Sequence, residues 1–84
     1  MKLRADNLSA REIDGDIVVL DLTSSQYFTV SGSGVVIFER LEAGATEDEL
    51  VAAVCAEYDV EPERARPDVR AFVQHLVAAG LIDD

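Results

Sequence analysis

The alternation of apolar and polar residues predicts three short strands in the first part of the chain. We expect them at Ala10–Ile13, Ile17–Leu22 and Gln26–Val30. Asp14-Gly15 is typical of a two-residue hairpin turn, because such a turn needs positive φ at both positions. The residues before Ala10 lack a clear pattern, and we expect them to be a loose lead-in.

The same alternation divides the side chains of the strands between two faces. On the second strand, one face holds Val18, Leu20 and Leu22, and the other holds Val19 and Asp21. On the third strand, Phe28 and Val30 fall on one face, and Tyr27 and Thr29 fall on the other. No later strand is predicted, so one edge of the third strand is expected to stay unpaired.

Apolar residues three and four positions apart predict two helices after the strands. The first is expected over Gly32–Glu42, with Ser31 as its cap, and Gly44 ends it. Its buried face comprises Gly34, Ile37, Phe38 and Leu41. The second begins at the capping box Thr46–Glu49 and continues to about Tyr58. Its inner face comprises Leu50, Val51, Val54 and Tyr58.

A third helix begins at Glu61-Pro62, because proline is favoured at the first helical position. Pro67 lacks an amide and restricts the residue before it, so we expect a kink near Ala65–Pro67 or a short turn before a main helix over Pro67–Ala79. The apolar face of this helix comprises Val69, Phe72, Val73 and Leu76. After Gly80, Leu81 and Ile82 are expected to fold back onto the core.

These elements predict an α+β fold in one domain, residues 1–84, with a small three-stranded antiparallel sheet followed by three helices. The order is similar to a winged helix-turn-helix with the sheet placed first. The net charge of −10, from 17 acids and 7 bases, disfavours nucleic acid as a partner. The apolar runs are too short to span a membrane and the N-terminus lacks a signal-peptide pattern, so we expect a cytoplasmic protein with no membrane partner.

Catalytic and metal chemistry find little support in the sequence. Cys55 is the one cysteine and His75 the one histidine, so the chain has neither a disulfide pair nor a cluster of metal ligands. His75 has no Cys or Ser partner at a useful offset, and a surface histidine is the simpler interpretation. We therefore expect no catalytic residue, no metal site and no cofactor.

Two kinds of binding remain. A winged-helix regulator of DNA is one, and the third helix carries Arg64, Arg66 and Arg70. Acids interleaved with these arginines weaken the attraction to phosphates. The other is a peptide, because an unpaired edge strand offers free backbone groups, and an apolar helix face beside it offers side-chain pockets. We favour the peptide. The same free edge also allows a dimer through two such strands.

The segment from Asp14 to Ile82 resembles the PqqD-like family, which comprises the RiPP precursor peptide recognition elements. The resemblance is carried by DGDIVVLDLTSSQYFTVSGSGVVIFERLEAGAT, EDELVAAVCAEYDVEPERA and DVRAFVQHLVAAGLI. The pattern is specific as an ordered combination and not in any single motif. Two departures stand out. Ser31-Gly32 occupies a place where the family often has Asn-Pro, and Pro67 replaces a common helix former, which predicts a shifted helix start.

The resemblance implies that the leader of a ribosomally made precursor peptide pairs as an extra strand with Gln26–Val30 and lies against the third helix. It implies backbone contacts along the strand, at Tyr27, Phe28, Thr29 and Val30. It implies a pocket built with Val69, Phe72, Val73 and Leu76. Charged leader residues are expected to meet Arg66, Asp68 and Arg70 at the rim.

The resemblance also implies a protein that is not an enzyme and that presents the precursor to one. In the lasso-peptide branch the recipients are a leader peptidase and a cyclase. In the quinone-cofactor branch the recipient is a radical enzyme, for which the protein acts as a peptide chaperone. We favour the lasso branch, because the sequence ends at Asp84 without a fused enzyme.

Overall fold

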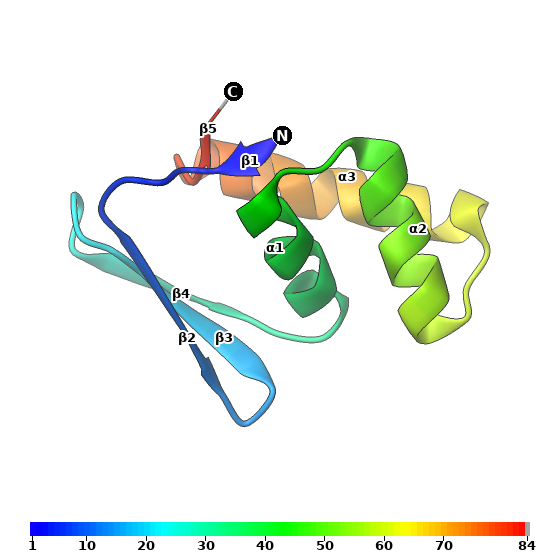
Figure 1. Cartoon of the computed structure of the whole chain (residues 1–84), viewed down its shortest axis with the longest axis horizontal. Helices are drawn as coiled ribbons and strands as arrows, with labels where there is room; N and C mark the ends of the chain where they lie inside the picture. The colour runs from blue at the N-terminus through cyan, green and yellow to red at the C-terminus, as the bar shows by residue number, and fades with distance from the viewer. Residues whose placement is uncertain (84) are drawn as a thin grey trace.

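A computed structural model describes residues 1–83 of the chain (Figure 1). The strands are β1 (Lys2–Leu3), β2 (Leu8–Ile13), β3 (Asp16–Asp21), β4 (Gln26–Val30) and β5 (Ile82–Asp83). The helices are α1 (Ser33–Ala43), α2 (Glu47–Tyr58) and α3 (Pro62–Ala78). A three-stranded antiparallel sheet followed by three helices confirms the predicted α+β fold.

The main sheet has the order β2-β3-β4, and both of its neighbouring pairs are antiparallel. Asp14 and Gly15 join β2 to β3 with φ angles of 52° and 87°, so the predicted hairpin turn is confirmed. Leu20 lies at the centre of the sheet, opposite Ser9 on β2 and Tyr27 on β4. This register fixes which side chains share a face.

The prediction of a loose lead-in before Ala10 is wrong. β1 pairs with β5 in a second, two-stranded sheet, and the side chain of Leu3 is buried in the core. The amide of Arg4 donates to the carbonyl of Leu81 at 2.8 Å, which extends this pairing. Leu81 itself is buried, as the sequence predicted. Figure 1 shows β1 and β5 side by side as a result.

The buried face of α1 is the predicted one, with Gly34, Ile37, Phe38 and Leu41 in the core. Ser31 is not its cap. Gly32 occupies that position with a φ of 61°, and no side chain bonds the free amides of the first turn. A glycine fits there because a residue with a Cβ rarely adopts positive φ. Gly44 ends α1 as predicted.

The capping box at the start of α2 is confirmed. The Glu49 amide donates to Oγ1 of Thr46 at 3.2 Å, and the Thr46 amide donates to Oε1 of Glu49 at 2.9 Å. Ala53 joins the inner face of the helix, whereas Tyr58 does not and remains 46% exposed. Tyr58 is the last residue of α2, one turn beyond the buried Val54, where the helix has passed the edge of the core.

The expected short turn before a main helix at Pro67 is also wrong, because α3 runs from Pro62 to Ala78 as one helix. Pro67 removes the amide that would bond the carbonyl of Glu63. Glu63 lies in the exposed first turn of the helix, where water can donate a hydrogen bond to that carbonyl. Pro67 therefore costs the helix little stability at this place, and the helix begins at Pro62.

The core lies between the sheet and the helices. α1 stands next to the sheet, and α2 and α3 pack beyond it (Figure 1). Ile17, Val19 and Asp21 point inward, whereas Leu20 and Leu22 lie on the solvent side of the sheet. The inward carboxylate of Asp21 is satisfied by Nη2 of Arg4 at 2.6 Å and by the Thr23 amide at 3.0 Å. Within residues 1–83, no helix is long and apolar enough to cross a bilayer.

Candidate functional site

β4 is an edge strand. Its one partner within residues 1–83 is β3, so the backbone groups on its other side have no strand to bond. The prediction that no later strand covers Gln26–Val30 is confirmed, because β5 pairs with β1 instead. β2 is the other edge of the sheet. What distinguishes β4 is that its last residue, Val30, lies where α1 and α3 meet, beside Gly34 and Phe72.

That packing depends on Gly34 in the first turn of α1. A methyl group placed on Gly34 would lie 2.9 Å from Cε1 of Phe72 and 3.1 Å from Cγ1 of Val30. The ring of Phe72 on α3 is therefore seated over α1 beside the end of β4. Phe72 and Phe28 are both only partly buried, so each keeps some apolar surface in reach of an added strand.

The residues predicted on α3 divide into three groups. Val69, Val73 and Leu76 are buried in the core. Asp68 is exposed and Phe72 is half-buried, and both lie on the side of the helix toward α1 and β4. Arg66 and Arg70 lie on the opposite side, because two positions along a helix are a rotation of about 200° from Asp68.

Both arginines are held by the start of α2. Nη1 of Arg66 lies 2.7 Å from Glu47 and 2.9 Å from Asp48, and Nε of Arg70 lies 2.8 Å from Glu47. The hydrogen bonds from Arg70 and Arg66 hold the pKa of the Glu47 carboxyl below its usual value. The structure thus brings Arg66 and Arg70 together with α2 and not with β4.

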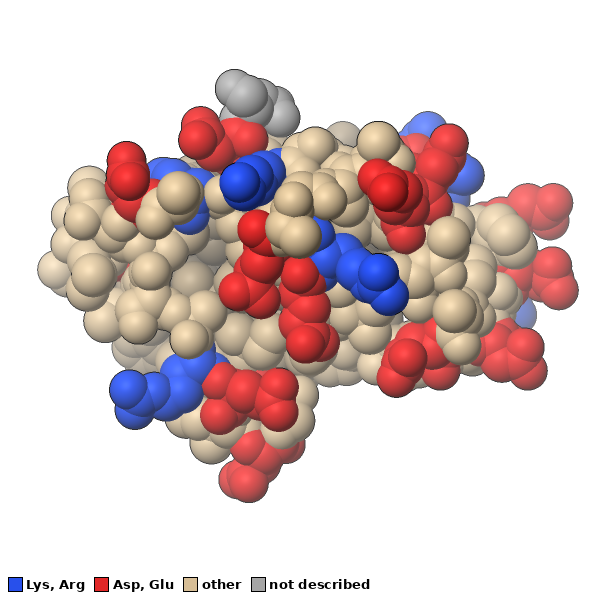
Figure 2. Space-filling view, in the orientation of Figure 1, with Lys and Arg blue, Asp and Glu red and all other residues tan. Residues whose placement is uncertain are grey.

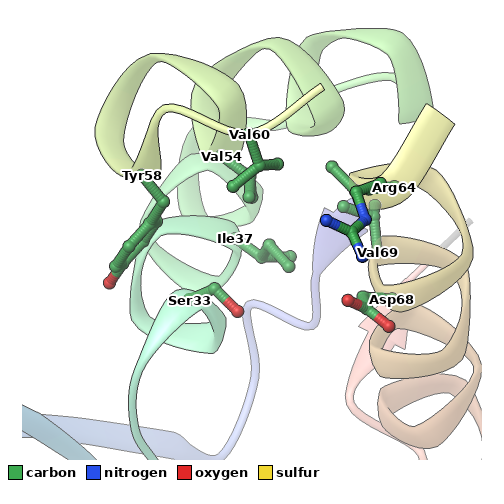
Figure 3. A pocket seen from close by; sticks show the side chains of 9 residues that line it. Ser33, Ile37, Val54, Tyr58, Val60, Arg64, Asp68 and Val69 are labelled. Carbon is green, nitrogen blue, oxygen red and sulfur yellow. The ribbon is translucent and has the colours of Figure 1, made fainter. Parts of the chain in front are cut away.

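A cavity of about 390 Å³ opens where the start of α1, the end of α2 and the start of α3 meet (Figure 3). Its apolar wall includes Ile37, Val54, Val60 and Val69. Its polar lining is Ser33, Tyr58, Arg64 and Asp68. Ser33 follows Val30 by only three residues, so the cavity begins just beyond the end of the β4 edge.

The sequence did not predict this cavity. Its lining comes from three helices, and Asp68 and Val69 alone had been named as candidates. One signal was present, because Arg64, Asp68, Phe72 and His75 recur at spacings of four, four and three and so share one helix face. His75, exposed on that face, belongs with the candidates. No cluster of metal-ligating side chains occurs among the described residues.

An open edge strand, a half-exposed aromatic ring and an adjoining cavity define a small α+β binding domain. The chain belongs to the PqqD family, because the family model described as Coenzyme PQQ synthesis protein D (PqqD) matches residues 16–82. A comparison with curated proteins finds no match.

Two solved structures are similar over nearly the whole chain. One is described as TbiB1 in complex with the TbiA(beta) leader peptide; it is 33% identical, with a TM-score of 0.87 and 100% of both chains covered. The other is described as lasso peptide synthetase B1 complexed with the leader peptide; it is 29% identical, with a TM-score of 0.82, and covers 95% of this chain and 93% of that one.

Proposed function

We propose that this protein binds the leader of a ribosomally synthesised precursor peptide in lasso-peptide biosynthesis. The observation that carries the proposal is the unpaired edge of β4, in a chain that is similar over its whole length to a protein in complex with a leader peptide. The leader adds to the sheet as a further strand. Its affinity comes mainly from backbone hydrogen bonds to Gln26–Val30.

The side chains of the leader supply specificity. In an added strand, alternate residues point to opposite faces of the sheet. Those that point inward meet Phe28 and Phe72, and the strand reaches the cavity beyond Val30, where Asp68 and Ser33 stand at the opening. Val69 forms part of the cavity wall, while Val73 and Leu76 support it from the core. Arg66 and Arg70 act by joining α3 to α2.

The protein acts as a binding partner and not as a catalyst. In this proposal, the single domain over residues 1–84 presents the bound precursor to the enzymes of its pathway, a leader peptidase and a cyclase. An edge-to-edge dimer through β4 is a competing use of the same backbone groups. The leader therefore dissociates any such dimer, which size-exclusion chromatography with light scattering measures directly.

Amide hydrogen exchange followed by NMR tests the proposed edge. On addition of a synthetic leader peptide, amides within Gln26–Val30 that face outward are expected to gain protection, because they donate to the new strand. The amides of β2, the other edge of the same sheet, serve as an internal control and should exchange as before. Protection gained on β2, or on neither edge, would count against the proposal.

A PqqD-type chaperone for a radical enzyme in quinone-cofactor biosynthesis is the second candidate, favoured by the description of the matching family model. Titration with a lasso leader and with a quinone precursor separates the two, since the tighter ligand identifies the pathway. DNA binding is not favoured. Arg66 and Arg70, two of the bases on α3, are already neutralised by acids of α2.

A further inference from the structure

The main sheet has a second open edge, which is formed by β2. Within residues 1–83, β3 is the one strand that pairs with β2. β2 is six residues long, contains no proline and pairs with β3 without a bulge from Leu8 to Ile13. Edge strands of soluble proteins are commonly shortened, bulged or interrupted by proline, which keeps other strands away. β2 has none of these three features, so its backbone is open to an added strand.

The pairing with β3 shows which backbone groups of β2 point outward. The amide of Leu22 donates to the carbonyl of Asn7 at 2.8 Å, so the next amide along, that of Leu8, points away from β3. Hydrogen-bonded and non-hydrogen-bonded pairs alternate along an antiparallel ladder. The amides and carbonyls of Leu8, Ala10 and Glu12 therefore face the open edge.

The inner side of β2 is open as well. Leu8, Ala10 and Glu12 lie on the inner side of the sheet, because the residues opposite them on β3 point inward. Ala10 and Glu12 are nevertheless exposed, since α1 packs against β1 and β4 and leaves β2 largely uncovered. Two cavities, of about 270 and 100 Å³, lie between β2 and α1. Ala10, Phe38 and Glu42 line both of them, so the two form one space, which we call the β2 groove.

The two ends of the β2 groove differ in chemistry. Near Leu8 the wall is apolar and includes the ring of Phe38. Near the other end of β2 the wall is acidic, with Glu12 on the strand and Glu39 and Glu42 on α1. The backbone edge runs past both ends, so an added strand would meet apolar surface first and carboxylates a few residues further on.

The cations that line the groove leave these carboxylates free. Arg4 is bonded to Asp21, Arg11 belongs to the outer side of the sheet, and Lys2 lies at the apolar end. None of the three acids of the groove has an ion pair among residues 1–83. Figure 2 shows acidic side chains gathered over α1 on this face of the molecule. The groove therefore attracts positive charge at one end.

We propose that the β2 groove binds an extended segment of a partner protein, which adds to β2 as a strand and carries a basic residue followed by apolar ones. Antiparallel pairing is the more stable arrangement. It places a Lys or Arg side chain against Glu12 and Glu42. Apolar side chains two and four positions later then lie over Ala10 and beside Leu8. The small side chain of Ala10 leaves room for the first of them against the Phe38 ring.

Charge excludes a second copy of this chain as the occupant. The β2 edge of a second copy would bring its own Glu12 into a groove that is already acidic, and a further −10 overall. A basic segment meets the opposite situation, because the same acids attract it. The inference does not rest on leader binding, since β2 and β4 are opposite edges of one sheet and both can be paired at once.

The probe is the synthetic peptide Lys-Thr-Lys-Thr-Val-Thr-Leu-Thr, blocked at both ends, whose lysines and apolar residues share one face of an extended strand. Amide hydrogen exchange followed by NMR locates its binding. The outward amides of Leu8, Ala10 and Glu12 are expected to gain protection. The same peptide with Glu in place of each Lys is the control and should bind about tenfold more weakly or worse.

Two variants test the backbone and the charge of the groove separately. Ala10→Pro removes an outward amide and no hydrogen bond to β3, so peptide binding should fall by about tenfold or more. Glu42→Gln keeps the shape of the groove and removes one charge, so binding should fall severalfold. Glu57→Gln, which changes an exposed acid of α2, is the matched control and should leave binding unchanged. If Ala10→Pro does not fold, Glu42→Gln still decides.

Three results would overturn the proposed groove: equal binding of the Lys and Glu peptides, unchanged binding in Glu42→Gln, or protection of β4 in place of β2. A wild-type protein that dimerises through β2 would do the same, because a second copy would then be the occupant. The probe contains no leader sequence, so these results are separate from a failure of the proposed leader binding.

Discussion

At the scale of single residues, Gly34 has the most specific role. Gly34→Ala is expected to displace the Phe72 ring, because the added Cβ would lie 2.9 Å from Cε1. Overpacking of this kind costs about 1–3 kcal/mol of unfolding free energy. Leader affinity should fall by roughly tenfold, since Phe72 then no longer flanks the added strand in the same position. Urea unfolding and fluorescence anisotropy with a labelled leader measure the two effects.

A second substitution separates the clash from a general loss of structure. Phe72→Leu shortens the side chain that meets the new methyl group, so the double variant Gly34→Ala/Phe72→Leu should regain part of the lost stability. If the stability losses of the two single variants simply add in the double variant, the clash between the new methyl group and Phe72 is not the cause of the destabilisation.

Arg4 and Asp21 give a prediction about pH. The hydrogen bond from Arg4 lowers the pKa of the Asp21 carboxyl, against the opposing effect of burial. A carboxyl whose folded pKa is lowered contributes stability above its unfolded pKa, near 3.8, and loses that contribution as the pH falls through the folded value. Arg4→Met should therefore destabilise the fold at about pH 7 and less at about pH 3, which lies below the pKa of the unfolded Asp21 carboxyl, where that carboxyl takes up a proton on unfolding.

Urea midpoints at the two pH values measure this difference. Arg11→Met is the control, because Arg11 is exposed on the sheet and has no ion pair among residues 1–83. An equal loss of stability at both pH values in Arg4→Met would show that Arg4 acts through packing and its backbone contacts alone, and not through the Asp21 charge.

The features that the sequence predicted correctly at this scale are local. The positive φ angles at Asp14 and Gly15 and the capping box of Thr46 and Glu49 each involve residues at most three positions apart. The burial of Gly34 was also predictable from helical spacing. Its contact with Phe72 was not, because that contact joins two helices that are far apart in the sequence.

At the scale of elements, the rotation of α3 decides which of its charges meet the leader. Arg70 bonds Glu47 on α2, whereas Asp68 lines the cavity near the end of β4. We expect Arg70→Ala to leave leader affinity within about twofold, and Asp68→Ala to change it by severalfold or more in a direction set by the charge of the leader. Isothermal titration of both variants with the same leader checks this.

The two variants also control for each other, because both truncate an exposed charged side chain on one helix. A large loss of affinity in Arg70→Ala with none in Asp68→Ala would place the leader on the α2 side of α3. That result would restore the assignment of Arg66 and Arg70 made from the sequence alone.

The errors at the scale of elements have two physical causes. β1 and β5 have only two residues each and stand at opposite ends of the chain, so neither shows a periodicity that the sequence could reveal. The expectation for Pro67 rested on the intrinsic effect of proline on a helix. That effect is small here, because Pro67 lies near the exposed first turn of α3. The strands and helices with long, regular patterns were predicted within a few residues.

At the scale of the whole molecule, the net charge of −10 is the dominant property. It favours a basic leader and accelerates its approach, so leader affinity should fall severalfold as ionic strength rises from about 0.05 M to about 0.5 M. Titrations over this range measure the slope. A leader whose Lys and Arg are replaced by Gln is the control and should show little salt dependence; an equally steep slope for that peptide would refute a steering role for charge.

The site was partly predictable at this scale. The free edge of β4 followed from counting strands, because no pattern later in the chain could supply a partner. The cavity did not follow, since its residues are contributed by three helices whose relative positions no local pattern encodes. The same holds for the core position of Val73 and Leu76, which the sequence could not separate from a position in the pocket.

The pairing of β1 with β5 has an architectural consequence. The chain enters and leaves the domain at one point, while β4 offers its free edge elsewhere (Figure 1). Such a domain can be inserted into a surface loop of another protein, because its two ends lie close together and need no long linkers to the receiving loop. Grafting residues 1–83 into a loop of a peptidase would thus bring a leader-capturing edge to that enzyme without rebuilding the fold.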